Sequence, residues 1–458
     1  MDFIALYPTW YDPAMGSGYW IALIATIHVV FSHTSVGAAL FFAWLINKAY
    51  REDKPELLQF VKKYGLFLLI FSYVMGSITG PGIWYSTTVG SPKGISALIH
   101  SFVWKWATEW VFFVIEVVGV YLLIYLTGKV DKRTHTYIAF IFAGASYATM
   151  MLILGILSFM MWPGSMEWFE KGGTYYSFFG PNTFAQLLIR TGFAMAVTAV
   201  VGSIVASAFK QDEVRHEVLR KLAGFGLVGT AIMFVFYFWY IQTIPANAVT
   251  VLQNRMPGWF YPAVATSFAL LVIYFLVTFF NTRLLTPVTA SVMLVIITFA
   301  GLFPTEITRE SMRKPYVAGQ YVYSNQIIAR DVPGMGIKSE LPKLEEKGLL
   351  QLHPFLPENY RTVTQENKLE VGRQIAIVMC ANCHQVTDTQ GIRPLKNYLG
   401  QETDVTRIKR YLKGTVVTGN ILYMPRIPLK ENELDALATY LASLNQSSSS
   451  SQTLQQKD

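Results

Sequence analysis

The only two cysteines of the 458-residue sequence, Cys380 and Cys383, are separated by two residues and followed at once by His384. This C-x-x-C-H arrangement is typical of covalent attachment of a c-type haem. The two thiols would bond the haem vinyl groups, and the histidine would ligate the iron. A zinc site would need more ligands, and a redox dithiol usually belongs to a thioredoxin-like pattern. The motif therefore predicts haem c and one-electron chemistry.

A haem c of useful potential also needs a soft ligand on its other face, and methionine is the usual one. Met424, in the run Leu422-Tyr423-Met424-Pro425, lies between the haem motif and the last predicted helix. We predict that Met424 is this sixth ligand. The alternative is a methionine that only fills a gap in the core or a loop.

The composition is that of a membrane protein. Hydrophobic residues make up 52% of the chain and charged residues 14%, whereas an average soluble domain has about 25% charged residues. The apolar material ends near Pro304, so the fold class we predict is all-α, a polytopic transmembrane helix bundle followed by a polar region. The net charge of +8 does not indicate nucleic acid as a partner, because the basic residues gather in short loops between apolar runs.

Eight apolar runs are long enough, at about 20 residues, to cross a bilayer as helices. Their approximate limits are Tyr19–Asn47, Tyr64–Tyr85, Val103–Leu126, Tyr137–Met161, Thr183–Ala208, Leu222–Ile244, Pro262–Phe280 and Leu285–Phe303. Basic residues concentrate in the loops after the first, third and fifth runs, so the positive-inside rule puts both termini outside the cytoplasm. We therefore expect a multi-pass protein of a bacterial inner membrane, with the haem c motif on the periplasmic side.

Four regions follow from this organisation. Residues 1–304 form the transmembrane domain, and residues 305–365, polar and dotted with prolines, form a periplasmic linker that packs on the outer face. A helical pattern before the cysteines and a closing amphipathic helix outline a small class I-like cytochrome c domain at residues 366–445. Residues 446–458 are rich in Ser and Gln and are expected to be disordered.

Ionisable side chains inside a membrane are costly, so those within the spans are candidates for function. The first span contains His28 and His33, which are five positions apart and therefore on different faces of a helix. One of them could ligate iron while the other faces a polar pocket. The alternative for each is a hydrogen-bonded packing residue.

The third span contains Lys105, Glu109 and Glu116, at spacings of four and seven that place them on one stripe of a helix. An inward line of this kind suits a metal ligand, a proton relay or both, and Glu109 and Glu116 are our candidate catalytic residues. The alternatives are a structural pair for the two glutamates and, for Lys105, a side chain that reaches out to the interface.

Three further charged residues lie at or near the outer ends of spans. Arg190, in the fifth span, could pair with a haem propionate or extend to the interface. Glu306 and Arg309 lie at the end of the eighth span, where a carboxylate beside arginines that can clamp propionates fits a haem site. Ordinary anchoring at the interface is the alternative.

Three stretches carry a family resemblance. They are the first span, with His28 ahead of Val36-Gly37; the third span, with two inward glutamates ending at Glu116; and the run Thr305-Glu306…Arg309…Lys314-Pro315-Tyr316. Together they resemble subunit I of the cytochrome bd oxygen reductases, in which the last run reads Thr-Glu-Val-Gly-Arg-Gln-Pro-Trp. The resemblance covers about residues 18–316, roughly two thirds of the chain.

This resemblance implies that His28 ligates one high-spin haem of an active-site pair and Glu306 the other, the cofactors being haem b, haem d or both. It implies that Glu109 and Glu116 serve the haem pocket and its proton supply. Their spacing is one residue shorter than in the family, which leaves open which of them approaches the iron. The implied partners are a second membrane subunit related to subunit II of the family, small extra subunits and membrane lipids.

The sequence also departs from the family pattern. The family's low-spin haem b needs a histidine in the fifth span, where this chain has Arg190, and a methionine that Leu222-Ala223-Gly224 does not offer. The outer quinol-binding loop after the sixth span is missing, because residues 245–261 are too few. We interpret the chain as similar to a cytochrome-c-containing branch of the superfamily, in which haem c replaces the quinol site and a low-spin haem b is absent.

The leading hypothesis is thus an oxidoreductase, a terminal oxidase-type subunit. A periplasmic donor such as a c-type cytochrome would reduce haem c, and a buried high-spin haem pair would reduce O₂ to water. One alternative is another small acceptor, for example nitric oxide, or a quinone-linked conduit to periplasmic cytochromes. Another is a non-enzymatic haem sensor or conduit subunit. The sequence leaves open haem b against haem d and any part for His33 or Lys105.

Overall fold

Among the residues that the structure describes, eight helical spans are long and apolar enough to cross a membrane, which confirms the predicted number. These residues are 8–171, 178–387, 393–400 and 402–455 of a computed structural model. The spans are α1 (Ser17–Arg51), α2–η1–α3 (Pro55–Leu68, Leu69–Val74 and Met75–Gly90), α4 (Pro92–Tyr125), α5 (Lys132–Met161), α7 (Pro181–Ser207), α8 (Asp212–Thr243), α10 (Phe260–Phe280) and α11–η4–α12 (Pro287–Ile296, Ile297–Leu302 and Phe303–Met312).

Two spans contain a π-helical turn, η1 in the second span and η4 in the last. Turns of this type interrupt the regular helical repeat and are frequent at functional sites. The turn η1 carries Tyr73, and η4 leads directly into α12. Within the described residues, the loops of the bundle contain three short elements: α6 (Glu167–Glu170), α9 (Ala246–Asn254) and η3 (Thr282–Leu284).

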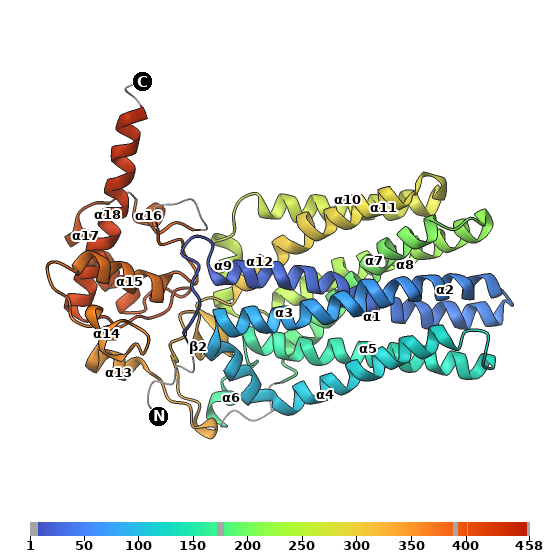
Figure 1. The fold of residues 1–458 in the computed structure, drawn as a ribbon, viewed down its shortest axis with the longest axis horizontal. Coiled ribbons are helices and arrows are strands. Elements are labelled where there is room, and N and C mark those ends of the chain that lie inside the picture. The colour runs from blue at the N-terminus through green and yellow to red at the C-terminus, as the bar shows by residue number, and fades with distance from the viewer. Residues whose placement is uncertain (1–7, 172–177, 388–392, 401, 456–458) are drawn as a thin grey trace.

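The helix α1 lies inside the bundle, in contact with α3, α5, α7 and α12 (Figure 1). Its closest approach is to α7 at Gly37, where a Cβ atom would overlap with the carbonyl oxygen of Ala194 and the hydroxyl of Thr198. The same hydroxyl donates a hydrogen bond of 2.8 Å to the carbonyl of Thr34. Small residues let membrane helices pack backbone to backbone, and this contact fixes α1 against α7.

The polar region after α12 forms a body at one end of the bundle, as Figure 1 shows in orange and red. The strands β1 (Tyr316–Ala318) and β2 (Val322–Tyr323) pair antiparallel. The remaining elements are η5 (Pro333–Met335), α13 (Leu341–Lys347), α14 (Leu349–Leu352), η6 (Glu358–Tyr360), α15 (Lys368–Cys380), α16 (Leu395–Tyr398), α17 (Val405–Leu412), η7 (Lys413–Val417) and α18 (Glu431–Gln455).

The segment 305–365 packs in two directions. Tyr321 stacks on Trp168 of the bundle with ring centroids 5.6 Å apart. Leu344 and Leu349, in contrast, are buried in the same hydrophobic cluster as α15 and α18. This segment therefore shares its core with the C-terminal helices as well as resting on the bundle.

The helix α18 is assigned from Glu431 to Gln455. The disorder predicted from residue 446 stays a prediction. Residues 456–458 of the predicted tail lie outside the described residues.

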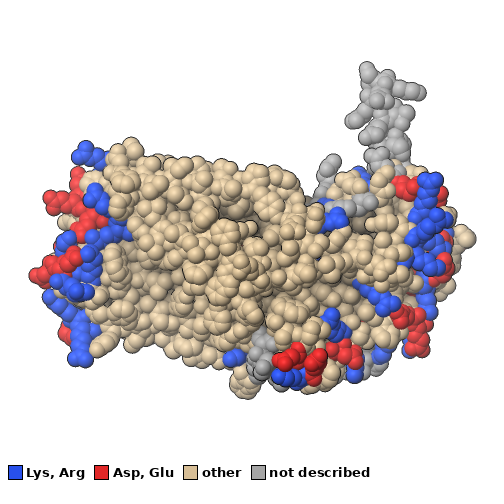
Figure 2. Space-filling model, turned by 180° about the vertical axis from the view of Figure 1, so that it is seen from behind, with Lys and Arg blue, Asp and Glu red and all other residues tan. Residues whose placement is uncertain are grey.

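Charged side chains gather at the two ends of the molecule, and a broad band of uncharged surface separates them (Figure 2). At the end remote from the C-terminal body, ion pairs join the inter-helix loops. Lys54 lies 2.8 Å from Glu217, and Lys132 lies 3.4 Å from Asp53. A band of this kind matches the hydrocarbon layer of a bilayer, as expected for a multi-pass membrane protein.

We predict that Gly37→Ala destabilises the bundle by about 1–3 kcal/mol, because the added methyl group forces α1 and α7 apart. Gly144→Ala in α5 is the matched control, since a Cβ there meets nothing within 4 Å. Thermal unfolding in detergent should show a lower melting temperature for Gly37→Ala alone. Equal melting temperatures for the two variants would contradict the packing described above.

Candidate haem-binding site

The side chain of His28 is oriented by a hydroxyl on the second span. Its Nδ1 lies 3.0 Å from Oγ1 of Thr79, and that hydroxyl donates its own proton to the carbonyl of Met75 at 2.8 Å. The hydroxyl must therefore accept a hydrogen bond from Nδ1–H, which leaves the lone pair on Nε2. A neutral histidine held in this way is the form that ligates iron. His28 thus fits a haem ligand.

His33 has the opposite arrangement. Its Nε2 lies 3.4 Å from Nη1 of Arg190, and a guanidinium group can only donate. Nε2 is therefore the acceptor, and Nδ1 carries the proton and faces the hydroxyl of Ser32 at 3.2 Å. The lone pair of His33 is engaged by Arg190. His28 is therefore the candidate ligand, and His33 is a hydrogen-bond partner of Arg190.

Glu306 is buried on α12 with a cation at each carboxylate oxygen. Oε1 accepts from Nη2 of Arg190 at 3.2 Å, and Oε2 accepts from Nε of Arg309 at 2.7 Å. The Arg190 side chain is only 14% exposed, so it serves as an ion-pair partner and does not extend to the interface. An ionised carboxylate has about four acceptor positions. The two arginines thus leave capacity for a metal or a further donor.

Glu116 forms a second buried polar cluster. Its carboxylate accepts hydrogen bonds from the hydroxyl of Tyr73 at 2.9 Å and from the hydroxyl of Ser35. The two hydroxyls are themselves 3.0 Å apart. These three side chains come from α4, η1 and α1, and together they can hold a proton or pass it on.

The other charged residues predicted in this span lie nearer its N-terminal end. Glu109 is half-buried on α4. The ammonium group of Lys105 lies over the rings of Phe178, at 5.1 Å, and Phe179, at 5.7 Å. A cation over aromatic faces is stabilised by the negative charge of the ring faces. The residues of the predicted stripe therefore have different neighbours. Lys105 contacts an aromatic pair, and Glu116 is hydrogen-bonded to α1.

The C-x-x-C-H motif starts at the end of α15, where the backbone turns sharply. The amides of Cys383 and His384 both donate to the carbonyl of Cys380, at 3.0 and 2.9 Å. Nδ1 of His384 lies 3.0 Å from the carbonyl oxygen of Arg393, which can only accept. Nδ1 therefore carries the proton in this contact. This arrangement fits the proximal ligand of a haem c.

The two cysteines are not bonded to each other, and burial raises the pKa of the Cys380 thiol to about 12. Redox-active and metal-binding cysteines have the opposite shift, because the thiolate is their working form. Met424 packs against the hydrophobic cluster of the C-terminal helices, while the sulfur of Met379 is 3.7 Å from Nδ2 of Asn325.

In the described part of the chain, no group of three or more His, Cys, Asp or Glu side chains is arranged to hold a metal ion. Haem iron does not need such a group, because the porphyrin supplies its equatorial ligands and the protein supplies the axial ones. The candidate ligands are accordingly dispersed, with His28 on α1 and Glu306 on α12.

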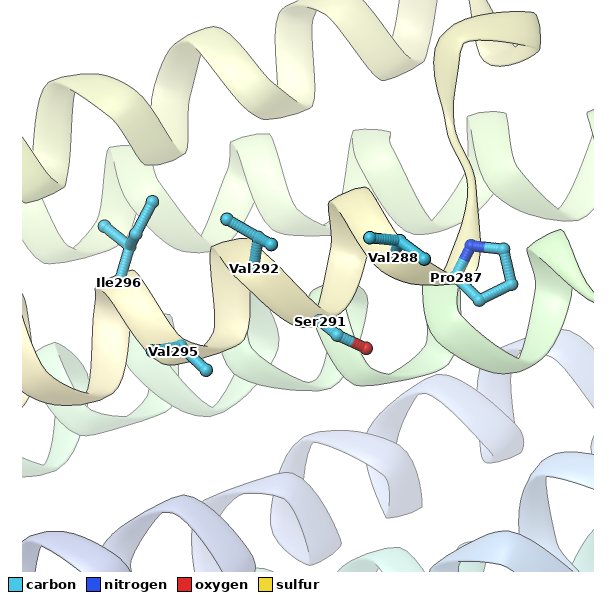
Figure 3. A pocket seen from close by; sticks show the side chains of 6 residues that line it. All are labelled: Pro287, Val288, Ser291, Val292, Val295 and Ile296. Atoms are coloured by element: carbon cyan, nitrogen blue, oxygen red, sulfur yellow. The ribbon is translucent and has the colours of Figure 1, made fainter.

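An apolar hollow on the outside of the last span contains none of the predicted site residues. Figure 3 shows its lining, which comes from α11 alone: Pro287, Val288, Ser291, Val292, Val295 and Ile296. Most of these side chains are exposed and apolar, as expected for a surface that faces lipid hydrocarbon.

The elements and sites together define an all-α, polytopic membrane bundle with buried, oriented histidine and carboxylate side chains. No protein family and no curated protein matches the sequence. A solved structure does match: that of the bd oxidase from Geobacillus thermodenitrificans, with a TM-score of 0.52 and 13% sequence identity. The match covers 72% of this chain and 91% of that chain. The likeness shows that the chain has the fold of a bd oxidase subunit.

Several residues of these sites were not found from the sequence. Thr79, Tyr73 and Ser35 are hydroxyl residues in apolar helices, where they usually bond their own backbone. Only the packing of α1 against the second span and α4 brings them to His28 and Glu116. The one signal in the sequence concerns Ser35, which lies in the same span as His28 and His33.

We predict that Glu306→Gln destabilises the protein strongly, by about 3–5 kcal/mol, because it leaves buried guanidinium groups without their counter-charge. Glu217→Gln is a matched control: Glu217 also contacts two cations, Lys54 and Lys221, but its side chain is 27% exposed against 3% for Glu306. Exposed pairs contribute only about 0–1 kcal/mol. Thermal unfolding in detergent should separate the two variants, and equal losses would contradict the network.

Proposed function

We propose that this chain is the haem-bearing subunit of a membrane oxidoreductase of the cytochrome bd type, supplied with electrons through its own haem c. Cys380 and Cys383 bind the haem covalently, and His384 and Met424 are its axial ligands. In the bundle, His28 and Glu306 hold a pair of high-spin haems, of type b, type d or both. The terminal acceptor is O₂, which four electrons and four protons convert to two molecules of water.

The chain's own side chains have separate tasks in this scheme. Thr79 orients His28 so that its Nε2 could ligate a metal, and the carbonyl of Arg393 orients the ring of His384. Arg190 and Arg309 hold the Glu306 carboxylate and can also pair with propionates. The bound haems supply the redox chemistry itself.

Protons are expected to reach the site along the buried carboxylates of α4. Glu116 exchanges hydrogen bonds with the hydroxyls of Tyr73 and Ser35, which can rotate and pass a proton between neighbours. Glu109 lies two turns away on the same helix. Both carboxylates are candidates for the proton relay.

The observation that carries the proposal is the orientation of His28 in the bundle. Its Nδ1–H is committed to the hydroxyl of Thr79, which leaves Nε2 as the ligating atom. The fold likeness to a solved bd oxidase supports the placement of haems in the bundle. A periplasmic donor, a second membrane subunit, both termini outside the cytoplasm and the absence of low-spin haem b belong to the same proposal.

The haem stoichiometry of the purified complex tests this function directly. Pyridine haemochrome spectra should give haem c together with haem b, haem d or both, and an electron donor of the ascorbate type should sustain O₂ consumption. Finding haem c alone would remove the bundle haems from the proposal. If the complex reduces a different acceptor and consumes no O₂, that molecule replaces O₂ as the proposed terminal acceptor.

The two histidines of α1 should respond differently to substitution. We expect His28→Ala to lose a high-spin haem signal, because no other imidazole replaces the ligand. His33→Ala should retain the haem and lose only its contact with Arg190. Optical spectra of the two variants, normalised to haem c, make this comparison. A full high-spin signal in His28→Ala would remove the ligand assignment.

Met424→Leu should keep the covalent haem but lower its midpoint potential, because a methionine ligand raises the potential of a haem c. Redox titration of the haem c absorbance measures this shift. Met379→Leu is the control, since Met379 is the only other methionine in residues 366–445 and its sulfur contacts Asn325. A potential that moves only in Met379→Leu would reverse the assignment.

A further inference from the structure

We propose that the haem c loop, defined as residues 380–386, is docked on the membrane bundle as a fixed junction. A haem c held on this loop would lie beside α12 on the side of Cys383, and its electrons would pass to the bundle with no movement of the C-terminal body. This inference rests on the proposed function, because it concerns the transfer of electrons between haem c and the bundle haems.

The loop is attached to the start of α1 by buried polar contacts. Asn382 lies between the two cysteines, and its Oδ1 accepts from the hydroxyl of Ser17 at 2.9 Å. Its Nδ2 donates to the carbonyl of Ser324 at 2.7 Å. All three residues are buried, so these hydrogen bonds are not replaced by water. One side chain of the haem motif thus joins the bundle to the segment after α12.

The chain before α1 adds backbone contacts. The amide of Val386 donates to the carbonyl of Pro13 at 3.0 Å. Gly16, which has a φ of +76°, lies so close to the loop that a Cβ would be 3.2 Å from the carbonyl oxygen of Ala381. Glycine adopts this backbone conformation without steric cost. The loop is therefore held from the N-terminal side as well.

A third attachment reaches α12 itself. Nη2 of Arg393 donates to the hydroxyl of Ser311 at 2.5 Å, while the carbonyl of the same arginine orients His384. The ammonium group of Lys314 pairs with Glu310 at 3.0 Å, and Lys314 and Cys383 line the same small cavity. The side of the motif that bears Cys383 therefore faces α12.

The path from this contact to the buried carboxylate is short. Ser311 and Glu306 lie on the same helix five residues apart, which at 1.5 Å per residue is about 7.5 Å along its axis. Cys383, Lys314 and Arg393 line one small cavity of about 30 Å³ together with residues of α1 and α12. In each transfer one electron passes from ferrous haem c to a ferric iron in the bundle, and no bond forms or breaks.

A fixed junction and a mobile haem domain predict different kinetics in the full protein. After rapid reduction of haem c by an ascorbate-type donor, we expect the rate of electron transfer to the bundle haem to be unchanged when glycerol raises the solvent viscosity several-fold. A rate that falls in proportion to viscosity would overturn the proposal, because it would require the domain to move. If no bundle haem is present at all, the proposed function itself fails.

Substitutions test the contacts. Asn382→Ala removes two buried hydrogen bonds and should slow transfer to the bundle haem about tenfold, the ratio that 1.4 kcal/mol gives, while the donor still reduces haem c at the wild-type rate. Asn420→Ala, an exposed position in the same domain, is the control and should behave as wild type. Ser17→Ala removes one of the same bonds from outside the haem domain and should slow transfer even where Asn382→Ala impairs haem attachment. Wild-type transfer in Ser17→Ala would overturn the proposal.

Discussion

The buried carboxylate of Glu306 is the interaction on which the membrane part depends. An ionised carboxylate in a bundle interior needs counter-charges, and Arg190 and Arg309 provide one at each oxygen. Arg190 also contacts His33, so a single charge network joins α1, α7 and α12. Each of these helices must keep its rotation about its own axis to maintain the network. The close contact of α1 with α7 at Gly37 also fixes the rotation of these two helices.

His28, His33 and His384 differ in their hydrogen-bond partners. At His28 a hydroxyl whose proton is already committed accepts from Nδ1 and leaves Nε2 for a metal, and a carbonyl beside His384 also accepts from Nδ1. A guanidinium beside His33 donates to Nε2 and removes that option. Residue type alone does not distinguish a ligand from a network residue, whereas the identity of the neighbouring atom does.

The local features of this chain could be predicted from its sequence, and the long-range ones could not. The eight spans depend on runs of apolar residues, and the C-x-x-C-H motif on adjacent residues, so both are visible in the sequence. Arg190 and Glu306 are separated by 116 positions, and only the packing of α7 against α12 pairs them. The turns η1 and η4 leave no compositional trace, yet η1 turns Tyr73 toward Glu116. The hydrophobic residues of the segment 305–365 were likewise too dispersed to reveal that they share a core with α15 and α18.

Arg190 links the membrane charges to the proposed supply of electrons. A guanidinium has no lone pair, so the fifth span cannot ligate a haem iron at this position. The same side chain neutralises Glu306 and thereby helps to hold α12 in place. Beyond Glu306, α12 continues to Ser311, where Arg393 of the C-terminal body is bonded. Arg190 therefore stabilises the helix that meets the loop of residues 380–386. In the proposed function, this helix lies between the bundle and the entry of electrons.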